Sequence, residues 1–506
     1  MMKSRETKAK LNIFISLICQ IVTMATGIII PKVMLSCFGS EVYGATTSIS
    51  QFLSYIALLE GGIGGVARSV LYKPLADRDN EKISAIVCEL QSFFKVVGFV
   101  FLIYVTILSV SFKAISHIQA LDWVSTVFLV LVISISTFAQ YFIGISYVVL
   151  LQADQKLYIT YIVNMITIII NAILVVLFSN FGMGIVFVKL LSSCIFAARP
   201  IMLYMYVRRN YVLTKTKCDE KLLKDKWTGL GQHIAFYVHT NTDIAILTFF
   251  TNLEVVAVYS VYYMTVNSIQ SIVTSFSNGM EAVFGNMYAK NEIHELKQTF
   301  RLYDTMISIV STVFFSTTAS LILSFIGLYT AGVSDTNYFR PGFSILLIIS
   351  AYIFCIRTPY HSMIIAAGRF KQTKWASYGE AIVNLSISIL LVINFGLIGV
   401  AIGTVFAVTF RYIFYMIYLS KHILRLKLWD YIKRITFNVM SFLCLLFINN
   451  YLVNKWIIRS FGAWLIIAAV VFSVATIAVI LINMIGYKKD VCSILSRMRL
   501  VKLRKQ

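Results

Sequence analysis

Four cationic side chains lie inside long apolar runs of this sequence. They are Lys189, Arg199, Arg357 and Arg411. Placing one charge at the centre of a bilayer costs roughly 2.5–3.5 kcal/mol on insertion scales, so such residues normally face a polar cavity or a partner. The alternative for each of them is a structural ion pair. The surplus of cations predicts a site that binds an anion.

The acidic residues in comparable positions are fewer. They are Asp243, Glu281, Glu380 and Glu60. Asp243 follows His239 by four residues, which places both on one helix face. A carboxylate beside an imidazole inside a membrane can bind a proton or Na⁺. We therefore expect Asp243 and His239 to form a coupling-ion site. The alternative is that they form an interhelical hydrogen bond.

Motifs that would indicate an enzyme are missing from the sequence. The six histidines form no H-E-x-x-H, the cysteines form no C-x-x-C, and no glycine-rich phosphate loop is present. We therefore expect no catalytic residues, no metal site and no cofactor.

The elements that must position these charges are membrane-spanning helices. Of the 506 residues, 59% are hydrophobic and only 13% are charged, and the mean hydropathy is +0.82. The apolar runs are about 20 residues long, the length that crosses a ~30 Å hydrocarbon core as a helix. This composition predicts an all-α integral membrane protein with about fourteen transmembrane helices.

Basic residues cluster in alternate loops. With the N-terminus in the cytoplasm, the opposite-side loops hold four basic residues: Lys113, Arg340, Lys455 and Arg459. Such a bias is typical of membrane insertion, so it predicts a multi-pass protein with both termini cytoplasmic. The net charge of +22 therefore does not indicate nucleic acid as a partner.

Short sequences recur at offsets of 212 to 214 residues. Leu150–Ala153 returns as Ile364–Ala367, and Asn180–Gly182 returns as Asn394–Gly396. We predict two parallel six-helix repeats around a central cavity, plus two extra helices. The predicted boundaries are a half at 1–207, a basic cytoplasmic linker at 208–228, a half at 229–427, and two peripheral helices with a basic tail at 428–506.

Polar residues line one face of the second and eighth predicted spans. At an offset of 213, Thr47 matches Ser260 and Ser54 matches Asn267, and Arg68 matches Glu281 at the cytoplasmic ends. Small and hydroxyl residues also suit close helix packing, which is the alternative interpretation. The matched charges predict a gate in which Arg68 contacts Glu281; otherwise both residues face cytoplasmic water.

The chain resembles the multidrug/oligosaccharidyl-lipid/polysaccharide exporter superfamily, and within it the flippases for O-antigen and capsule repeat units. The resemblance covers nearly the whole chain. The residues that carry it are Phe38–Gly44 and Leu59–Gly64, with counterparts at Asn252–Tyr259 and Gly279–Gly285.

This resemblance implies a flippase in a bacterial inner membrane. Its cargo would be undecaprenyl-diphosphate-linked oligosaccharide for polysaccharide biosynthesis, of capsule or lipopolysaccharide. It implies alternating access, and as partners membrane lipids, a proton or Na⁺ gradient, a polysaccharide polymerase and glycosyltransferases. The expected substrate-binding cations are Arg68, Lys189, Arg199, Arg357 and Arg411. The alternatives are a multidrug exporter of the same superfamily, coupled to a cation, and a membrane polymerase or glycosyltransferase.

Overall fold

The chain is mostly helical in the described part, which is residues 2–60, 63–214, 230–277, 280–369, 372–425 and 427–503 of a computed structural model. Some side chains near the two ends and within 230–240 are not described. The residues form two compact units, 1–258 and 259–506, and each is described by itself.

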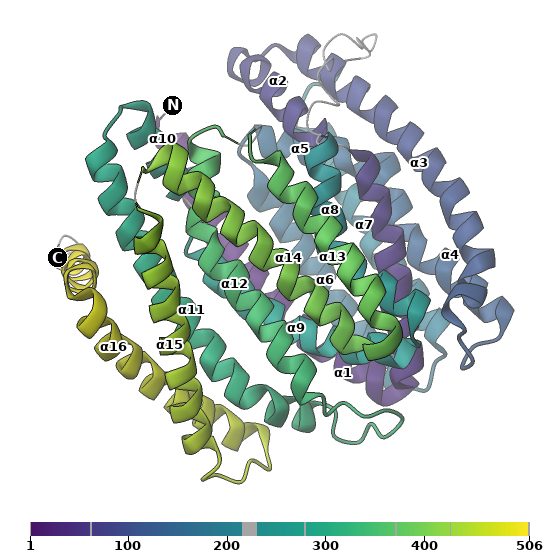
Figure 1. The fold of residues 1–506 in the computed structure, drawn as a ribbon. Helices are drawn as coiled ribbons and strands as arrows, with labels where there is room; N and C mark the ends of the chain where they lie inside the picture. The colour runs from purple at the N-terminus through teal and green to yellow at the C-terminus, as the bar shows by residue number, and fades with distance from the viewer. Residues whose placement is uncertain are drawn as a thin grey trace. The chain divides into compact units, whose positions relative to one another are not determined.

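The helices of the first unit, drawn from purple to teal in Figure 1, are long and apolar. They are α1 (Met2–Ser54), α2 (Ile63–Asp77), α3 (Asn80–Ser116), α4 (Trp123–Ala139), α5 (Ile145–Ala153), α6 (Leu157–Asn180), α7 (Ile185–Asn210) and α8 (Leu230–Phe250). A π-helical turn, Gln140–Gly144, joins α4 to α5 without a break in the helix.

The next helix, α9 (Leu253–Ser275), crosses from the first unit into the second. The remaining helices are α10 (Met280–Ala289), α11 (Ile293–Tyr329), α12 (Pro341–Ala366), α13 (Lys374–Phe395), α14 (Leu397–Tyr418), α15 (Leu428–Val453) and α16 (Phe461–Leu503).

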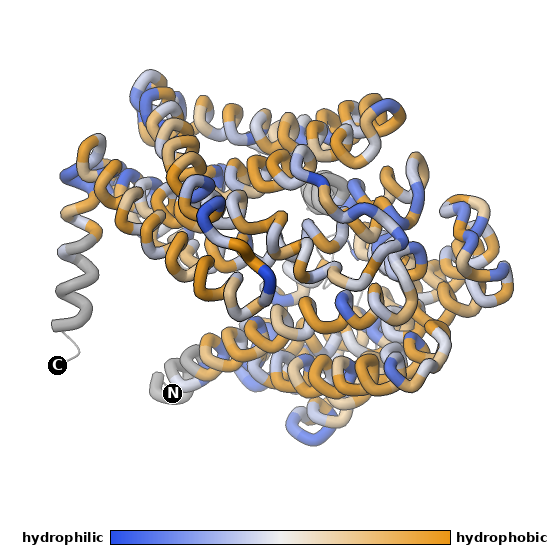
Figure 2. The backbone as a smooth tube through the Cα atoms, turned by 90° about the horizontal axis from the view of Figure 1, so that it is seen from below, coloured by the Kyte–Doolittle hydropathy of each residue, from blue (hydrophilic) through white to orange (hydrophobic). Residues whose placement is uncertain are grey.

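Eleven helical stretches among the described residues are long and apolar enough to cross a membrane. The stretch Leu11–Glu60 covers two predicted spans, because α1 is kinked at Gly39 (φ 79°). Together with the less apolar α8 and α9, these stretches correspond to the fourteen predicted spans. Figure 2 shows hydrophobic residues along most of the helices and hydrophilic residues at the turns between them. The chain is therefore a multi-pass membrane protein.

The internal repeat is confirmed by backbone features that recur at the predicted offset. The helices α3 and α11 are both 37 residues long, and each begins and ends 213 residues from the other. Left-handed residues precede both helices, Arg78 and Asn291, each with φ 56°. Gly182 and Gly396 also share a positive φ at the turns after α6 and α13. Such conformations are uncommon, so their recurrence reflects one six-helix design used twice.

Two predicted spans are interrupted, which corrects the expectation of one continuous polar face. The second span leaves the α-helix after Ser54 for a 3₁₀ turn, Tyr55–Glu60, and Arg68 lies on the separate helix α2. In the eighth span α9 ends at Ser275, and Glu281 lies in the first turn of α10. The sequence after each interruption contains glycine, which disfavours the helix interior by about 1 kcal/mol relative to alanine.

Close helix packing depends on a few glycines. A Cβ atom at Gly44 would lie 1.9 Å from the carbonyl oxygen of Leu253, so α1 and the start of α9 touch backbone to backbone. In the second unit α13 and α14 run side by side (Figure 1), and a Cβ at Gly403 would lie 2.1 Å from Ser388 Oγ. Gly399 and Gly403 form a G-x-x-x-G pattern, which is typical of tight packing between membrane helices.

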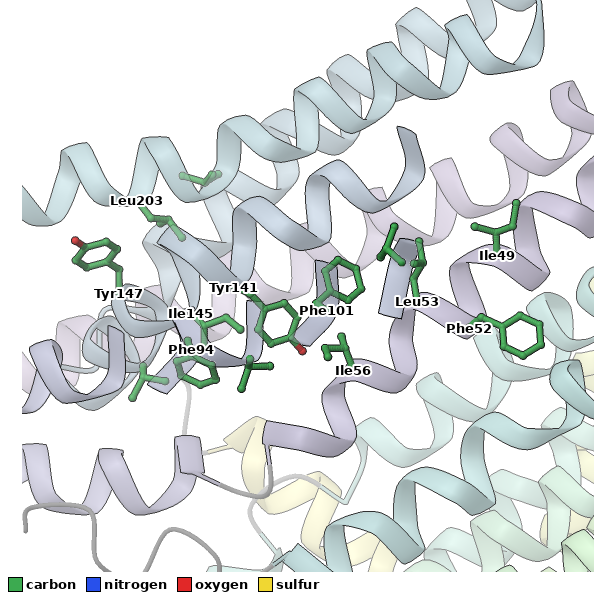
Figure 3. Packing of buried hydrophobic residues seen from close by; sticks show 14 of the residues in the cluster. Ile49, Phe52, Leu53, Ile56, Phe94, Phe101, Tyr141, Ile145, Tyr147 and Leu203 are labelled. Carbon is green, nitrogen blue, oxygen red and sulfur yellow. The ribbon is translucent and has the colours of Figure 1, made fainter. Parts of the chain in front are cut away.

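The core of the first unit is apolar and aromatic. The centroid of the Tyr141 ring lies 6.1 Å from that of Phe101 and 6.3 Å from that of Phe94. Figure 3 shows the three rings packed with Ile145. The outer surfaces of the helices are apolar as well, as at Ile103, which is 65% exposed. This pattern is expected when the solvent is lipid rather than water.

In the second unit α11 carries both extra helices, which we expected to be peripheral. Polar contacts occur along its length: Asn438 donates to Ser308 at 3.0 Å, and Asn449 donates to Ser316 at 3.3 Å. Near the N-terminal end of α11, Arg434 pairs with the buried Asp304 at 2.9 Å. These contacts fix α15 on α11. On α16, Asp490 accepts from Arg301 Nε of α11 at 2.8 Å, so α11 holds both extra helices.

Candidate functional site

A buried cluster of three charged side chains joins α12, α13 and α14 in the second unit. Arg357 Nη1 donates to Glu380 Oε1 at 2.5 Å, and Arg411 Nη1 donates to Glu380 Oε2. All three residues are buried, with exposed fractions of 4%, 0% and 6% for Arg357, Glu380 and Arg411. One carboxylate thus bridges two guanidinium groups that come from two other helices. We call Arg357, Glu380 and Arg411 the charged triad.

Aromatic side chains complete the surroundings of the triad. Arg411 Nε donates to the Tyr415 hydroxyl at 2.8 Å, and Arg357 lies 4.7 Å from the centre of the Phe354 ring. The His361 ring stacks on Tyr415, with centroids 5.8 Å apart. Guanidinium groups bind carboxylates and aromatic faces well because they are planar and weakly hydrated. With two cations and one anion, the triad retains one positive charge.

The sequence suggested that buried acids were too few to pair the arginines, and the triad corrects this in part. Glu380 pairs with Arg357 and Arg411 at once because its two oxygens point to different helices. One feature of the sequence could have predicted this pairing. Glu380 lies on the predicted helix that follows the helix of Arg357 and precedes the helix of Arg411. Which oxygen meets which arginine depends on the helix packing.

Arg199 and Lys189, the two predicted cations inside the spans of the first unit, have no such acidic partner among the described residues. Arg199 on α7 donates from Nε to Thr167 Oγ1 on α6 at 2.6 Å, and its guanidinium lies 4.2 Å from the centre of the Phe196 ring. Lys189 is half-buried, and no described residue forms a hydrogen bond or ion pair with it. The charges of Arg199 and Lys189 are therefore not neutralised by the described part of the first unit.

Arg68 and Glu281 belong to different units. Arg68 Nη1 donates to Gln152 Oε1 at 2.7 Å, which ties α2 to the end of α5. Glu281 is exposed in the first turn of α10. The gate contact between Arg68 and Glu281 stays a prediction.

Polar side chains gather where α1 passes into the 3₁₀ turn Tyr55–Glu60. Tyr237 on α8 donates to Ser54 at 2.5 Å, and Tyr55 donates to the carbonyl of Asn241 at 2.8 Å. Asp243 interacts electrostatically with Tyr55. The structure thus brings Ser54, from the predicted polar face, beside the helix of Asp243. The side chain of His239 lies outside the described residues, so its pairing with Asp243 stays a prediction.

Glu60 belongs to the same region of the first unit. Tyr141 donates to Glu60 Oε1 at 2.5 Å, and Figure 3 shows the Tyr141 hydroxyl on the side of Ile56, in the same 3₁₀ turn. No group of three or more His, Cys, Asp or Glu residues is arranged to hold a metal ion in the described ranges.

A second charged cluster, which the sequence did not indicate, lies outside the spans of the first unit. Asp154, in the turn after α5, accepts from Lys8 Nζ at 3.1 Å, Lys156 Nζ at 2.7 Å and the Tyr211 hydroxyl at 2.5 Å. Burial alone would raise the pKa of the Asp154 carboxyl, but the hydrogen bonds from Lys156, Tyr211 and Lys8 outweigh it and lower that pKa. This cluster fastens the start of α1 to the α5–α6 turn.

Comparison with known proteins gives the fold but no family by sequence. No family model matches the chain, and no curated protein matches it. Among solved structures, the lipid II flippase MurJ in an inward closed conformation superposes with a TM-score of 0.68 at 15% identity, covering 94% of this chain and 99% of that one.

Two transporters of another kind share the architecture. A eukaryotic MATE transporter superposes with a TM-score of 0.57 at 14% identity, covering 85% of this chain and 99% of that one. An outward-facing multidrug resistance MATE transporter of the MOP superfamily gives 0.54 at 14% identity, covering 82% and 96%. This all-helical chain therefore has the MurJ- and MATE-like transporter fold.

Proposed function

We propose that this protein translocates undecaprenyl-diphosphate-linked oligosaccharide repeat units from the inner to the outer leaflet of a bacterial cell membrane. It does so by alternating access, with both termini in the cytoplasm. Its fold supports this proposal because a lipid II flippase has the same fold. The exported repeat units serve surface polysaccharide biosynthesis.

The observation that carries the proposal is the surplus of cations within the spans. Arg199 is bound by a hydroxyl, Lys189 has no partner among the described residues, and the triad sets two arginines against Glu380. A diphosphate carries the complementary charge, and guanidinium groups bind phosphate oxygens in a bidentate way. A positively charged cargo would leave these cations unpaired.

The proposed roles of the individual residues follow the sequence prediction. Arg68, Lys189 and Arg199 bind substrate in the first unit, and Arg357 and Arg411 contribute the residual positive charge of the triad. Arg68 also pairs with Glu281 at the cytoplasmic gate. Glycosyltransferases act before the transport step, and a polysaccharide polymerase acts after it.

Asp243, with His239, is the proposed site for a coupling proton or Na⁺. Asp243→Asn removes the charge and keeps the shape of the side chain. We expect the variant in liposomes to lose the dependence of transport on the ion gradient. Wild-type gradient dependence in Asp243→Asn would place the coupling site elsewhere.

A deletion strain tests the proposed function. Without this protein, and with no other flippase present, surface polysaccharide should disappear while lipid-linked repeat units accumulate on the cytoplasmic side. Restoring the gene should restore the polysaccharide. Normal surface polysaccharide in the deletion strain would refute the proposal.

A multidrug exporter coupled to a cation is the second candidate, and the MATE transporters of the same fold favour it. Such an exporter would lower the intracellular level of a fluorescent cationic dye in an ion-dependent way. The surplus of cations disfavours this cargo, because like charges repel in a poorly screened site. Dye efflux that is equal in wild-type and deletion cells would exclude the dye as cargo.

A further inference from the structure

The last helix, α16, changes direction where its apolar part ends. The part from Phe461 to Ile485 is mostly apolar and is long enough to cross the hydrocarbon core of a bilayer. The backbone then departs from helical geometry at Tyr487 (φ −136°, ψ 43°) and is helical again as far as Leu503. Figure 1 shows the final turns, beside the C label, almost end-on, whereas the rest of α16 runs across the view. Residues 488–503 therefore leave the axis of the span.

Contacts with two other helices of the second unit hold this bend. The Tyr487 ring packs edge-to-face on Phe437 of α15, with ring centroids 5.0 Å apart. A Cβ atom at Gly486 would lie 2.6 Å from the Phe437 ring, so the chain passes close to α15. Asp490, which is 6% exposed, accepts from Arg301 Nε on α11 at 2.8 Å. These contacts fix the point at which α16 changes direction.

The chain after the bend is strongly basic. Residues 488–506 contain seven Lys and Arg residues and one acid, Asp490. Because Asp490 is paired with Arg301 of α11, it does not neutralise the basic residues around it. Lys488 and Lys489 are exposed, and no described residue forms an ion pair with either of them. The segment therefore presents a net positive charge at the surface of the second unit.

The sequence after the bend also has the period of an amphipathic helix. Between residues 488 and 499 the large apolar residues are Val491, Ile494, Leu495 and Met498. Spacings of three, four and seven from the first of them place all four on one side of a helix. The four basic residues of the same stretch fall outside that side. A basic amphipathic helix of this kind is typical of a segment that lies in the plane of a membrane surface.

The partner that fits this segment is a leaflet with anionic headgroups. Anionic phospholipids give a bilayer surface a negative potential, which attracts basic segments beside a span. The bend places the basic residues directly after Ile485, which is 87% exposed as expected for a residue in contact with lipid. The charges therefore follow the end of the hydrocarbon core, where headgroups begin. The apolar side of the helix suits the boundary between headgroups and acyl chains.

We propose that residues 488–503 of α16 form an interfacial helix that binds the headgroups of anionic phospholipids. The helix lies on the leaflet at the side of the C-terminus, which is the cytoplasmic leaflet in the orientation proposed above. Its basic residues contact headgroup phosphates, and the pair of Asp490 and Arg301 holds its start beside α11. This lipid contact does not depend on what the protein transports.

Hydrogen exchange of residues 488–503 in the full-length protein tests the proposal. The protein is reconstituted at low salt in nanodiscs of phosphatidylcholine alone, and in nanodiscs of phosphatidylcholine with phosphatidylglycerol. A neutral variant removes five positive charges of the segment: Lys488→Gln, Lys489→Gln, Arg497→Gln, Arg499→Gln and Lys502→Gln. A control variant of equal net charge replaces five exposed lysines elsewhere in the second unit: Lys290→Gln, Lys374→Gln, Lys421→Gln, Lys427→Gln and Lys433→Gln.

We expect the amides of residues 488–503 to exchange at least tenfold more slowly with phosphatidylglycerol than without it, in the wild type and in the control variant. The neutral variant should lose most of this difference. Raising the salt to about 0.5 M should also remove most of it in the wild type, because the charges are screened. Equal exchange of the wild type in both nanodiscs overturns the proposal. A neutral variant that keeps the full difference, or protection that persists at high salt, overturns it as well.

Discussion

Replacing Glu380 by glutamine tests whether the charged triad holds α12, α13 and α14 together. In the wild-type protein the triad has two cations and one anion. Glu380→Gln strands two buried guanidinium groups, whereas Arg357→Gln leaves a neutral pair of Arg411 and Glu380. The side chains of the triad are only 1–7% exposed, so water cannot hydrate the stranded charges.

The magnitudes differ accordingly. Removing one partner of a buried ion pair costs roughly 3–5 kcal/mol, and we assign this range to Glu380→Gln. A lost hydrogen bond to a charged group costs about 1.5–3 kcal/mol, which is the expectation for Arg357→Gln. Arg411 keeps its bond to Tyr415 in both variants, so the order of the two losses is set by the uncompensated charge.

The assay is the thermal unfolding midpoint of the purified protein in detergent, with Arg459→Gln as the control. Arg459 is an exposed arginine, and its replacement should have little effect. A larger loss in Arg357→Gln than in Glu380→Gln, or a wild-type midpoint in Glu380→Gln, would refute the reasoning.

A triple variant separates the structural role of the triad from a role in binding. Arg357→Met, Glu380→Leu and Arg411→Met together remove every charge and keep most of the volume. Replacing a buried ionic cluster by apolar side chains is often neutral or stabilising, so the midpoint should recover. If these arginines also hold the diphosphate, the triple variant should be stable but should not transport. Full transport by a stable triple variant would show that the triad does not bind cargo.

Three further predictions concern other parts of the chain. Asp154→Asn should destabilise the start of α1 by about 1 kcal/mol, measured by hydrogen exchange. The pKa of Asp154 is lowered below its ordinary value of 3.8, so the stabilisation by the carboxylate is complete above pH 3.8 and is lost only as the pH falls through the lower pKa of the folded state. Exchange protection of the wild-type protein at the start of α1 that weakens between pH 7 and 5 would contradict this prediction. Gly44→Ala should lower the unfolding midpoint because its Cβ would collide with a carbonyl of α9, whereas Gly27→Ala on the same helix, with nothing within 4 Å, should not; equal midpoints would refute the close approach. Arg68→Glu and Glu281→Arg should each impair transport and together restore much of it, and a double variant no better than the worse single one would exclude the gate.

The sequence by itself determined that the helix surfaces face lipid and that the chain contains an internal repeat. Apolar runs of about 20 residues exclude water as the solvent of the helix surfaces, because only lipid accepts so much exposed apolar side chain. The offset of 212 to 214 residues was visible in short matches, and the structure repeats it in the bounds of α3 and α11. These properties are local or periodic, so a linear chain displays them.

Only the tertiary structure decided which charges are neutralised. Arg199 and Arg411 are equivalent in sequence, but Arg411 meets Glu380 and Arg199 meets Thr167. The interruptions after Ser54 and Ser275 were also hidden, because three-and-four spacing looks the same in a continuous helix and in two short ones. The physical reason is that the energy of a buried charge is set by atoms within a few ångströms, and those atoms come from helices distant in the chain.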